Sequence, residues 1–182
     1  MSAATIIAFA LLAFVAVTIF KGVRIVPQGY KWIVQRLGKY HTTLNPGLNF
    51  VIPYVDEVAY KVTTKDIVLD IPSQEVISRD NAVLLMNAVA YINLTTPEKA
   101  VYGIENYAWA IQNLVQTSLR SIVGEMDLDD ALSSRDHIKA RLKASISDDI
   151  SDWGITLKTV EIQDIKPSHT MQAAMEEQAA AE

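Results

Sequence analysis

The first residues of the chain form an unbroken apolar run. From Ala3 to Phe20 there is no charged residue, no Pro and no Gly, and the two Thr residues can bond to their own helix backbone. As a helix rising about 1.5 Å per residue, this run is roughly 27 Å long, close to the ~30 Å hydrocarbon core of a bilayer. A helix buried in a globular core would normally show a polar face. The pattern therefore predicts a transmembrane anchor over residues 1–22.

A cleaved signal peptide is the competing interpretation of this run. It requires a basic stretch before the apolar core, but only the chain amino group precedes Ala3. The small-x-small triplet at residues 8–10 comes too early in the run, and residues 18–20 (Thr-Ile-Phe) make a poor cleavage site. A mitochondrial transit peptide would contain Arg, which the first twenty residues lack. We therefore expect an uncleaved anchor.

Residues 23–95 follow a pattern typical of β-strands. Aromatic and branched side chains are frequent in residues 30–37, and turn signals occur at residues 27–29 (Pro-Gln-Gly) and 45–47 (Asn-Pro-Gly). Pro72 is predicted to end one of the strands. The alternating apolar positions are Leu48, Phe50, Ile52, Val58, Tyr60, Val62, Ile67, Leu69 and Ile71.

A hairpin is predicted at the end of this β-rich region. Its turn is Arg79-Asp80-Asn81, and its arms are residues 75–78 and 83–94. One face of the second arm is continuously apolar, with Leu84, Met86, Ala88, Ala90, Ile92 and Leu94. Successive strands joined by short turns predict a mainly antiparallel sheet.

The period becomes helical after residue 95. Pro97 opens a short helix, and Asn106 is placed to cap the next helix, which Gly124 can close. The predicted apolar face of that second helix is Tyr107, Ile111, Leu114, Ser118 and Ile122.

A third helix and a further strand are predicted next. Ser133 and Asp136 have the spacing of a capping box, and Gly154 ends the helix. Residues 155–165 regain strand character, with a change of parity that indicates a bulge near Lys158. The apolar residues of the helix are Ile138, Leu142, Ile146, Ile150 and Trp153.

The last segment, residues 167–182, is predicted to begin a C-terminal helix. So short a helix is marginal in water by itself, so we expect continuing sequence or neighbouring subunits to hold it. The fold class is thus α+β. We expect an anchor at 1–22, one domain at 23–166 (β-rich in 23–95, α/β in 96–166) and an assembly helix from 167 to 182.

The charges orient the anchor. The first acidic residue is Asp56, and the basic residues before it are Lys21, Arg24, Lys31, Arg36 and Lys39. Basic residues beside a spanning helix stay on the cytoplasmic side, so the N-terminus is expected outside and the domain in the cytoplasm. The net charge of -5 argues against nucleic acid as a partner. The sequence contains no Cys, which excludes disulfides and thiolate sites.

Several short blocks in a fixed order resemble one known family. They lie at residues 26–30, 36–40, 44–48, 52–54, 70–81, 119–124, 132–135 and 153–155. The chain resembles the stomatin/prohibitin/flotillin/HflK-C superfamily, the SPFH or band 7 proteins. Within it, the chain is most similar to the paraslipin branch, which includes bacterial QmcA-type and mitochondrial stomatin-like proteins. Family members usually continue into a long Ala/Glu-rich helix, of which only the first turns are present.

The resemblance implies a membrane-associated α+β domain that forms a large homo-oligomer, a ring or cage. It implies a scaffold that organises membrane microdomains or regulates membrane proteins such as proteases. It also implies an NfeD-type membrane protein or a membrane protease as partner. The location implied is the inner (cytoplasmic) membrane of a prokaryote.

No catalytic, cofactor or metal residue is expected. His41, His137 and His169 fall in separate predicted elements, and the sequence has no HExxH, GxSxG or phosphate-loop pattern. The acidic cluster Asp127, Asp129 and Asp130 lacks the Gly and distal Glu of a calcium loop, so we interpret it as helix capping. The alternatives to a scaffold are a membrane-associated hydrolase and a monomeric membrane-tethered binding module.

The apolar residues of the early β region allow two interpretations. Leu44, Leu48, Phe50, Ile52 and Tyr54 follow the anchor closely in sequence. They either dip into the membrane interface, where an aromatic ring is satisfied at both ends, or face the core of the domain.

Overall fold

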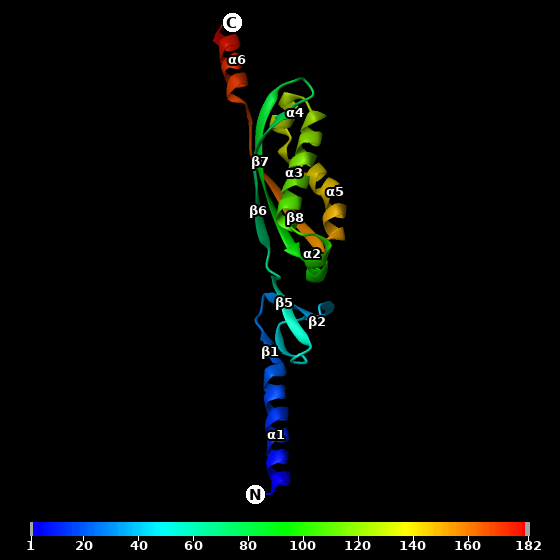
Figure 1. Cartoon of the computed structure of the whole chain (residues 1–182). Coiled ribbons are helices and arrows are strands. Elements are labelled where there is room, and N and C mark those ends of the chain that lie inside the picture. The colour runs from blue at the N-terminus through cyan, green and yellow to red at the C-terminus, as the bar shows by residue number, and fades with distance from the viewer. Residues whose placement is uncertain (1, 181–182) are drawn as a thin grey trace. The chain divides into compact units, whose positions relative to one another are not determined.

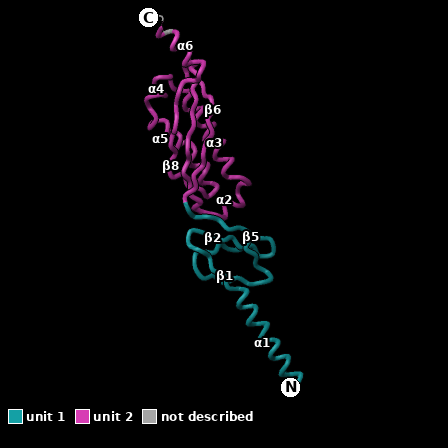
Figure 2. The backbone as a smooth tube through the Cα atoms, turned by 90° about the vertical axis from the view of Figure 1, so that its left-hand side faces the viewer, with its two compact units in different colours: residues 1–65 teal, residues 66–182 magenta. Residues whose placement is uncertain are grey.

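The computed structural model describes residues 2–180, except the side chain of Gln178. The chain divides into two compact units, residues up to Lys65 and residues from Asp66 onward (Figure 2). The paired strands of the described residues are all antiparallel, and they form three sheets. The predicted α+β class, with an apolar N-terminal helix and a helix beginning at the C-terminal end, is confirmed.

Unit 1 joins the apolar helix to two small sheets. Strands β1 and β4 form a ribbon, and β3, β2 and β5 form a sheet in that order (Figure 1). The elements are α1 (Ala3–Gly22), β1 (Val23–Val26), β2 (Tyr30–Arg36), β3 (Lys39–Leu44), β4 (Gly47–Phe50) and β5 (Asp56–Thr63). The small core between them consists of buried Val26, Val34, Leu44 and Val51, with Trp32 and Val58 packed against it.

Unit 2 is a three-stranded sheet with helices on one face. The strand order is β6-β7-β8, and α3 and α5 lie over the same face (Figure 1). The elements are β6 (Ile67–Ile77), β7 (Val83–Leu94), α2 (Pro97–Gly103), α3 (Tyr107–Gly124), α4 (Leu128–Ser133), α5 (Arg135–Asp152), β8 (Ile155–Pro167) and α6 (His169–Ala180).

The core of unit 2 lies between this sheet and its helices. The predicted apolar face of β7 is confirmed: the six residues from Leu84 to Leu94 at every second position are buried. The predicted face of α5 is confirmed for four fully buried residues, Ile138, Leu142, Ile146 and Ile150, whereas Trp153 follows the end of the helix and is half-buried. Gly154, at φ +69°, ends α5 as predicted, in a conformation that favours glycine.

Both outer strands of this sheet are bulged where they pass Asn87. The register shifts between Ile71 and Gln74 on β6, and beside Gln163 on β8. The Asn87 side chain donates to Gln163 Oε1 and accepts from the Asp164 amide, both at 2.9 Å. The prediction that Pro72 ends a strand is therefore wrong, because a bulge removes the need for a ladder amide at that position. The bulge predicted near Lys158 is confirmed.

Two details of the helices differ from expectation, and one agrees with it. The buried face of α3 is formed by Ile111, Val115, Leu119, Ile122 and Val123, whereas Leu114 and Ser118 are only half-buried. The expected Ser133–Asp136 capping box is also wrong. Ser133 is the last residue of α4, where its hydroxyl donates to the Asp129 carbonyl, and α5 begins only at Arg135. Asn106 caps α3 as predicted, accepting from the Trp109 amide.

Polar side chains cover both outer edges of the unit 2 sheet. Along β8, Arg135 and Lys143 of α5 donate to the carbonyls of Gln163 and Lys158, at 3.3 and 3.1 Å. Along β6, Gln112 of α3 donates to the Asp70 carbonyl at 2.8 Å. These carbonyls are therefore occupied, which disfavours pairing of the edges with another strand.

The final helix, α6, has little support from its own unit. Ser168 is buried and caps it by accepting from the Met171 amide at 3.4 Å. Residues 173–177, 179 and 180 are all exposed. The predicted helix extended to 182; residues 181–182 and the side chain of Gln178 lie outside the described residues.

Candidate membrane-interaction surface

Helix α1 is apolar on all sides, and none of its apolar run is buried by the rest of the protein. It is long and apolar enough to cross a membrane. Its large side chains, such as Leu12 and Phe20, are exposed along the whole length. Thr18 donates its hydroxyl proton to the Phe14 carbonyl at 2.8 Å, so this polar group is satisfied within the helix. An exposed apolar surface of this size indicates contact with lipid or with another protein.

The β1–β4 ribbon continues this apolar surface beyond the helix. Val23 lies opposite Phe50, and Ile25 lies opposite Leu48. These four side chains are all exposed, Leu48 by 76%. Because opposite residues point to the same face of a ribbon, they form one apolar strip. We call this strip, together with Leu37, Ile52 and Tyr54, the apolar collar.

Tyr54 brings a loop back alongside the helix. Its ring stacks on Phe14 of α1, with centroids 6.4 Å apart and planes 5° apart. Lys21 Nζ lies 6.0 Å from the centroid of the same ring. Phe14 is about 12 Å before the end of α1, at 1.5 Å per residue. The loop therefore overlaps the last two turns of the apolar helix.

A buried ion pair fixes two parts of the collar. Arg36 holds Asp56 through two hydrogen bonds, of 2.6 and 3.0 Å, and Asp56 also accepts from the Ile52 amide at 2.9 Å. The Asp56 side chain is only 2% exposed. The Arg36 guanidinium lowers the pKa of the Asp56 carboxyl to about 2. Leu37 follows Arg36 directly, and its amide bonds to the Val55 carbonyl at 3.2 Å.

For the apolar residues between positions 44 and 54, the sequence left open whether they face the domain core or the membrane interface, and the structure decides part of this choice. Leu44 is buried in the core of unit 1, so the interpretation as a core residue holds for it. Leu48, Phe50, Ile52 and Tyr54 are exposed, as an interfacial role requires. The Arg36–Asp56 pair and the Phe14–Tyr54 stack were missed from sequence. The position of Asp56 as the first acid after five basic residues was the one available signal.

The histidines and acidic residues do not converge on a site. His41 lies on β3, His137 on α5 and His169 on α6. Within residues 2–180, no group of three His, Asp or Glu side chains could hold a metal ion.

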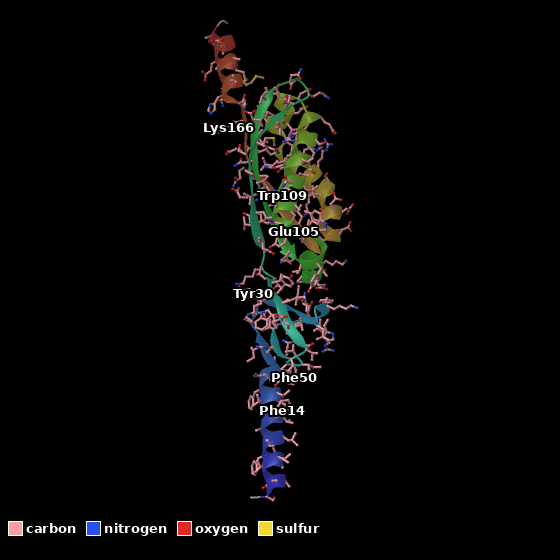
Figure 3. All side chains as sticks on the ribbon, in the orientation of Figure 1. Phe14, Tyr30, Phe50, Glu105, Trp109 and Lys166 are labelled. Carbon is pink, nitrogen blue, oxygen red and sulfur yellow. The ribbon has the colours of Figure 1, made fainter. Side chains whose placement is uncertain are left out.

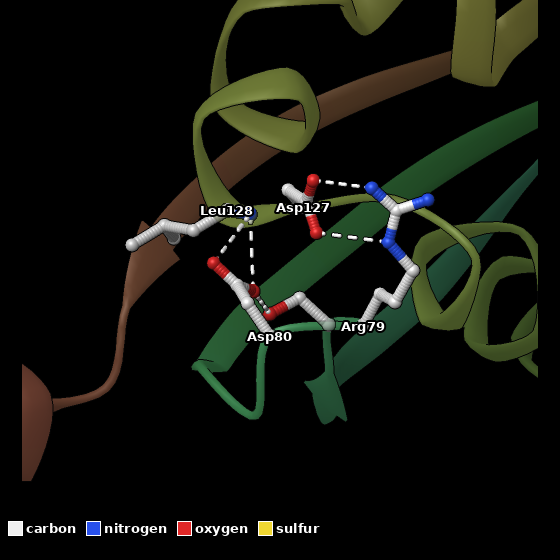
Figure 4. Close-up of polar contacts among 5 residues, drawn as sticks. Arg79, Asp80, Asp127 and Leu128 are labelled. Atoms are coloured by element: carbon white, nitrogen blue, oxygen red, sulfur yellow. Dashed lines mark hydrogen bonds and ion pairs between the residues drawn. The ribbon is translucent and has the colours of Figure 1, made fainter.

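The expected helix capping by the acidic cluster near residue 127 is wrong for Asp127, whose side chain makes no capping hydrogen bond to α4 (Figure 4). Asp127 occupies the N-cap position of α4, but its carboxylate binds Arg79, with Nε at 3.0 Å from Oδ1. Asp80, in the β6–β7 turn, instead accepts from the Leu128 amide at 3.2 Å and from the Ser78 hydroxyl. The Ser78 hydrogen bond is the main cause of the lowered pKa of Asp80. The hairpin turn thus caps a helix that lies far along the chain.

Known proteins are similar in sequence to this chain over most of its length. An uncharacterised protein of Methanocaldococcus jannaschii is 40% identical over 90% of this chain and 82% of its own length. Rat stomatin-like protein 2, mitochondrial, is 36% identical over 86% of this chain and 44% of its own. An uncharacterised protein of Mycobacterium tuberculosis is 36% identical over 92% of this chain and 44% of its own length. The chain therefore spans less than half the length of the rat and mycobacterial relatives.

A model of one family also covers the apolar collar, except Val23, and the whole of unit 2. The model of the SPFH domain / Band 7 family matches residues 24–182. The archaeal relative is matched along most of both chains. The resemblance to stomatin-like proteins is thereby confirmed, and the chain belongs to the SPFH domain / Band 7 family.

Proposed function

We propose that this protein is a membrane-anchored scaffold without catalytic activity. Helix α1 crosses the bilayer, the apolar collar lies in the membrane interface, and the body of the protein serves as an assembly unit. The observation that carries the proposal is the continuity of apolar surface from α1 onto Val23, Ile25, Leu48 and Phe50, all of them exposed. Water exposure of so much apolar surface is unfavourable, by about 25 cal/mol per Å².

The basic residues beside the helix set its orientation in this proposal. Lys21 lies in the last turn of α1 and Arg24 on β1. Such residues stay on the cytoplasmic side of a spanning helix. The proposed location is therefore the inner membrane of a prokaryote, with the N-terminus outside. A reporter active only in the cytoplasm, fused after residue 182, should be active, and a reporter active only after export should be silent there.

Assembly into a large homo-oligomer is the second part of the proposal. The edges of the unit 2 sheet are occupied by side chains of α3 and α5, so strand addition is disfavoured. Helix α6 leaves Ala173, Ala174 and Met175 exposed and Met171 half-buried. Packing of α6 against copies of itself in a closed ring would cover them. An NfeD-type membrane protein or a membrane protease is the proposed partner, on the ground of the family alone.

Two measurements on the full chain test this function. After carbonate washing of membranes, the protein should stay in the membrane pellet. Its detergent-solubilised particle should be a large oligomer. Deletion of the residues after Pro167 should reduce this particle to small oligomers. The far-UV circular dichroism spectrum should show that the domain of the truncated protein is still folded. A monomeric full-length particle would favour the membrane-tethered binding module, and release by carbonate would contradict the anchor.

A further inference from the structure

A pocket opens at the base of unit 1, beside the end of the apolar helix. Its volume is about 320 Å³, within the range of small-molecule sites. The pocket is lined by Arg24, Trp32, Val51, Asp56, Glu57, Val58 and Lys61. Val51, Val58 and the Trp32 ring belong to the core cluster of this unit. The pocket therefore combines an apolar floor with charged walls.

The chain connectivity ties this pocket to the end of α1. Arg24 stands two residues after Gly22, the last residue of α1. The Val51 amide donates to the Gly22 carbonyl at 2.8 Å. The inference that follows rests on the proposed function, because α1 in a bilayer would place this pocket at the depth of the lipid headgroups.

The pocket contains charged side chains of both signs, and three of the four form no ion pair within the described residues. Asp56 is engaged by Arg36 and by the Ile52 amide. Within residues 2–180, Arg24, Glu57 and Lys61 form no ion pair. Lys61 Nζ is held over the Trp32 ring, 4.6 Å from its centroid. The pocket wall thus contains two cations and one carboxylate that form no ion pair within the described residues.

These groups match the chemistry of one class of headgroup. A guanidinium fork binds phosphate oxygens through two hydrogen bonds, and a lysine ammonium adds a point charge. A carboxylate accepts hydrogen bonds from a primary ammonium group. We propose that the pocket binds a phospholipid headgroup that carries both a phosphodiester and a primary ammonium. Arg24 and Lys61 hold the phosphate and Glu57 holds the ammonium, while the apolar floor contacts the methylene groups between them.

Native mass spectrometry of the full chain in detergent tests this assignment. The probes are phosphatidylethanolamine and phosphatidylglycerol, added separately, with bound lipid counted per subunit. The wild type should retain phosphatidylethanolamine more tightly than phosphatidylglycerol. Arg24→Gln and Lys61→Gln should each weaken phosphatidylethanolamine binding at least about tenfold, and Lys61→Arg should restore much of it. Glu57→Gln should weaken phosphatidylethanolamine and leave phosphatidylglycerol unchanged.

The matched control is Lys39→Gln, which removes a basic residue of the same unit outside the pocket and should change nothing. Equal binding by all variants would overturn the site, and equal binding of the two lipids by the wild type would overturn the role of Glu57. Circular dichroism checks that each variant is folded. Displacement by inorganic phosphate as effective as by glycerophosphoethanolamine would show a site for free phosphate and overturn the lipid assignment. Carbonate release of the protein from membranes would contradict the proposed function separately, because lipid binding is measured in detergent.

Discussion

The amide of Val51 donates a hydrogen bond to the carbonyl of Gly22, at 2.8 Å, and so joins the last residue of α1 to the loop that follows β4. A Cβ atom on Gly22 would lie 2.7 Å from the Val51 carbonyl oxygen and 2.9 Å from the Phe50 ring. The approach of helix and chain at this point therefore requires glycine. The junction positions the apolar collar relative to the helix.

Gly22→Ala should loosen this junction. Because backbone must move to admit the methyl group, unit 1 should lose about 1–3 kcal/mol of stability. The measurement is the midpoint of thermal unfolding in detergent, with limited proteolysis of the 51–55 loop as a second readout. Gly103→Ala is the matched control, because nothing lies within 4 Å of its Cβ position. Equal behaviour of the two variants would refute a close contact at Gly22.

Asp56→Ala should destabilise unit 1 and free the Tyr54 loop. Removing a carboxylate that accepts three hydrogen bonds should cost about 1.5–3 kcal/mol, measured by urea unfolding at pH 7. The exposed neighbour Glu57, changed to Gln, is the control and should have little effect on stability. An unchanged unfolding midpoint for Asp56→Ala would show that the ion pair does not hold the loop.

The same carboxyl gives unit 1 a specific acid sensitivity. The pKa of Asp56 falls from 3.8 to about 2 on folding, chiefly through Arg36. A group with a lowered pKa stabilises the fold above its unfolded pKa, and this stabilisation is lost as the pH falls from about 4 to about 2. Urea midpoints measured over this window should drop for the wild type, and should drop less for Asp56→Ala. If the urea midpoints of the wild type and of Asp56→Ala fell equally with pH, Asp56 would not be the source of this acid sensitivity.

Asp80→Ala should weaken unit 2 more than Arg79→Ala does. Asp80 satisfies the free amide at the start of α4, whereas Arg79 and Asp127 form an exposed ion pair of small expected benefit (Figure 4). Urea midpoints of the two variants give the comparison. Asp149→Ala, an exposed carboxylate on α5, is the control. A larger effect of Arg79→Ala would show that the ion pair, and not the cap, joins the hairpin to α4.

Because side chains of α5 cover the β8 edge, their removal should make the protein aggregate faster. The double variant Arg135→Ala with Lys143→Ala leaves the bulge carbonyls of Gln163 and Lys158 without their side-chain donors, so thermal aggregation should become several-fold faster. The control is Lys158→Ala with Lys166→Ala, which removes the same charge from exposed positions of β8. Light scattering during a temperature ramp measures both. Equal aggregation rates of the two double variants would show that any effect comes from the lost charge alone and not from the uncovered edge.

The sequence correctly predicted the elements in which the spacing of apolar residues matches the pattern of burial in the structure. The six alternating residues of β7 and the four apolar residues of α5 face the core because each pattern leaves one choice of face. On α3, two overlapping apolar stripes compete, and packing against the sheet selected the one that contains Val115 and Leu119. The parity change at Lys158 was visible, whereas the bulge at Pro72 was hidden because proline also ends strands.

The candidate surface was only partly predictable for a different reason. The apolar run of α1 and the basic residues behind it are local signals and were read directly. Contacts such as Phe14–Tyr54 and Arg36–Asp56 join positions far apart in the chain, and no local pattern specifies them. Alternation alone also could not separate exposed Leu48 from buried Leu44, because both are apolar residues in short strands beside a turn.

The central claim is that α1 and the apolar collar enter the membrane together. Because the chain contains no Cys, single labels can be placed by Ile52→Cys, in the collar, and by Lys65→Cys. The Thr64 amide bonds to the Gly29 carbonyl, which places Lys65 beside Tyr30, at the start of β2, away from Phe14 (Figure 3). The length of β2, about 20 Å at 3.3 Å per residue, separates that end from the Leu37 turn.

Both labelled proteins would be reconstituted in nanodiscs that contain lipid-borne spin quenchers, and label fluorescence compared with and without the quencher. The label at Ile52 should be strongly quenched and poorly accessible to iodide in the water, whereas the label at Lys65 should show the reverse. Equal quenching at the two positions, or full iodide access at Ile52, would contradict the account.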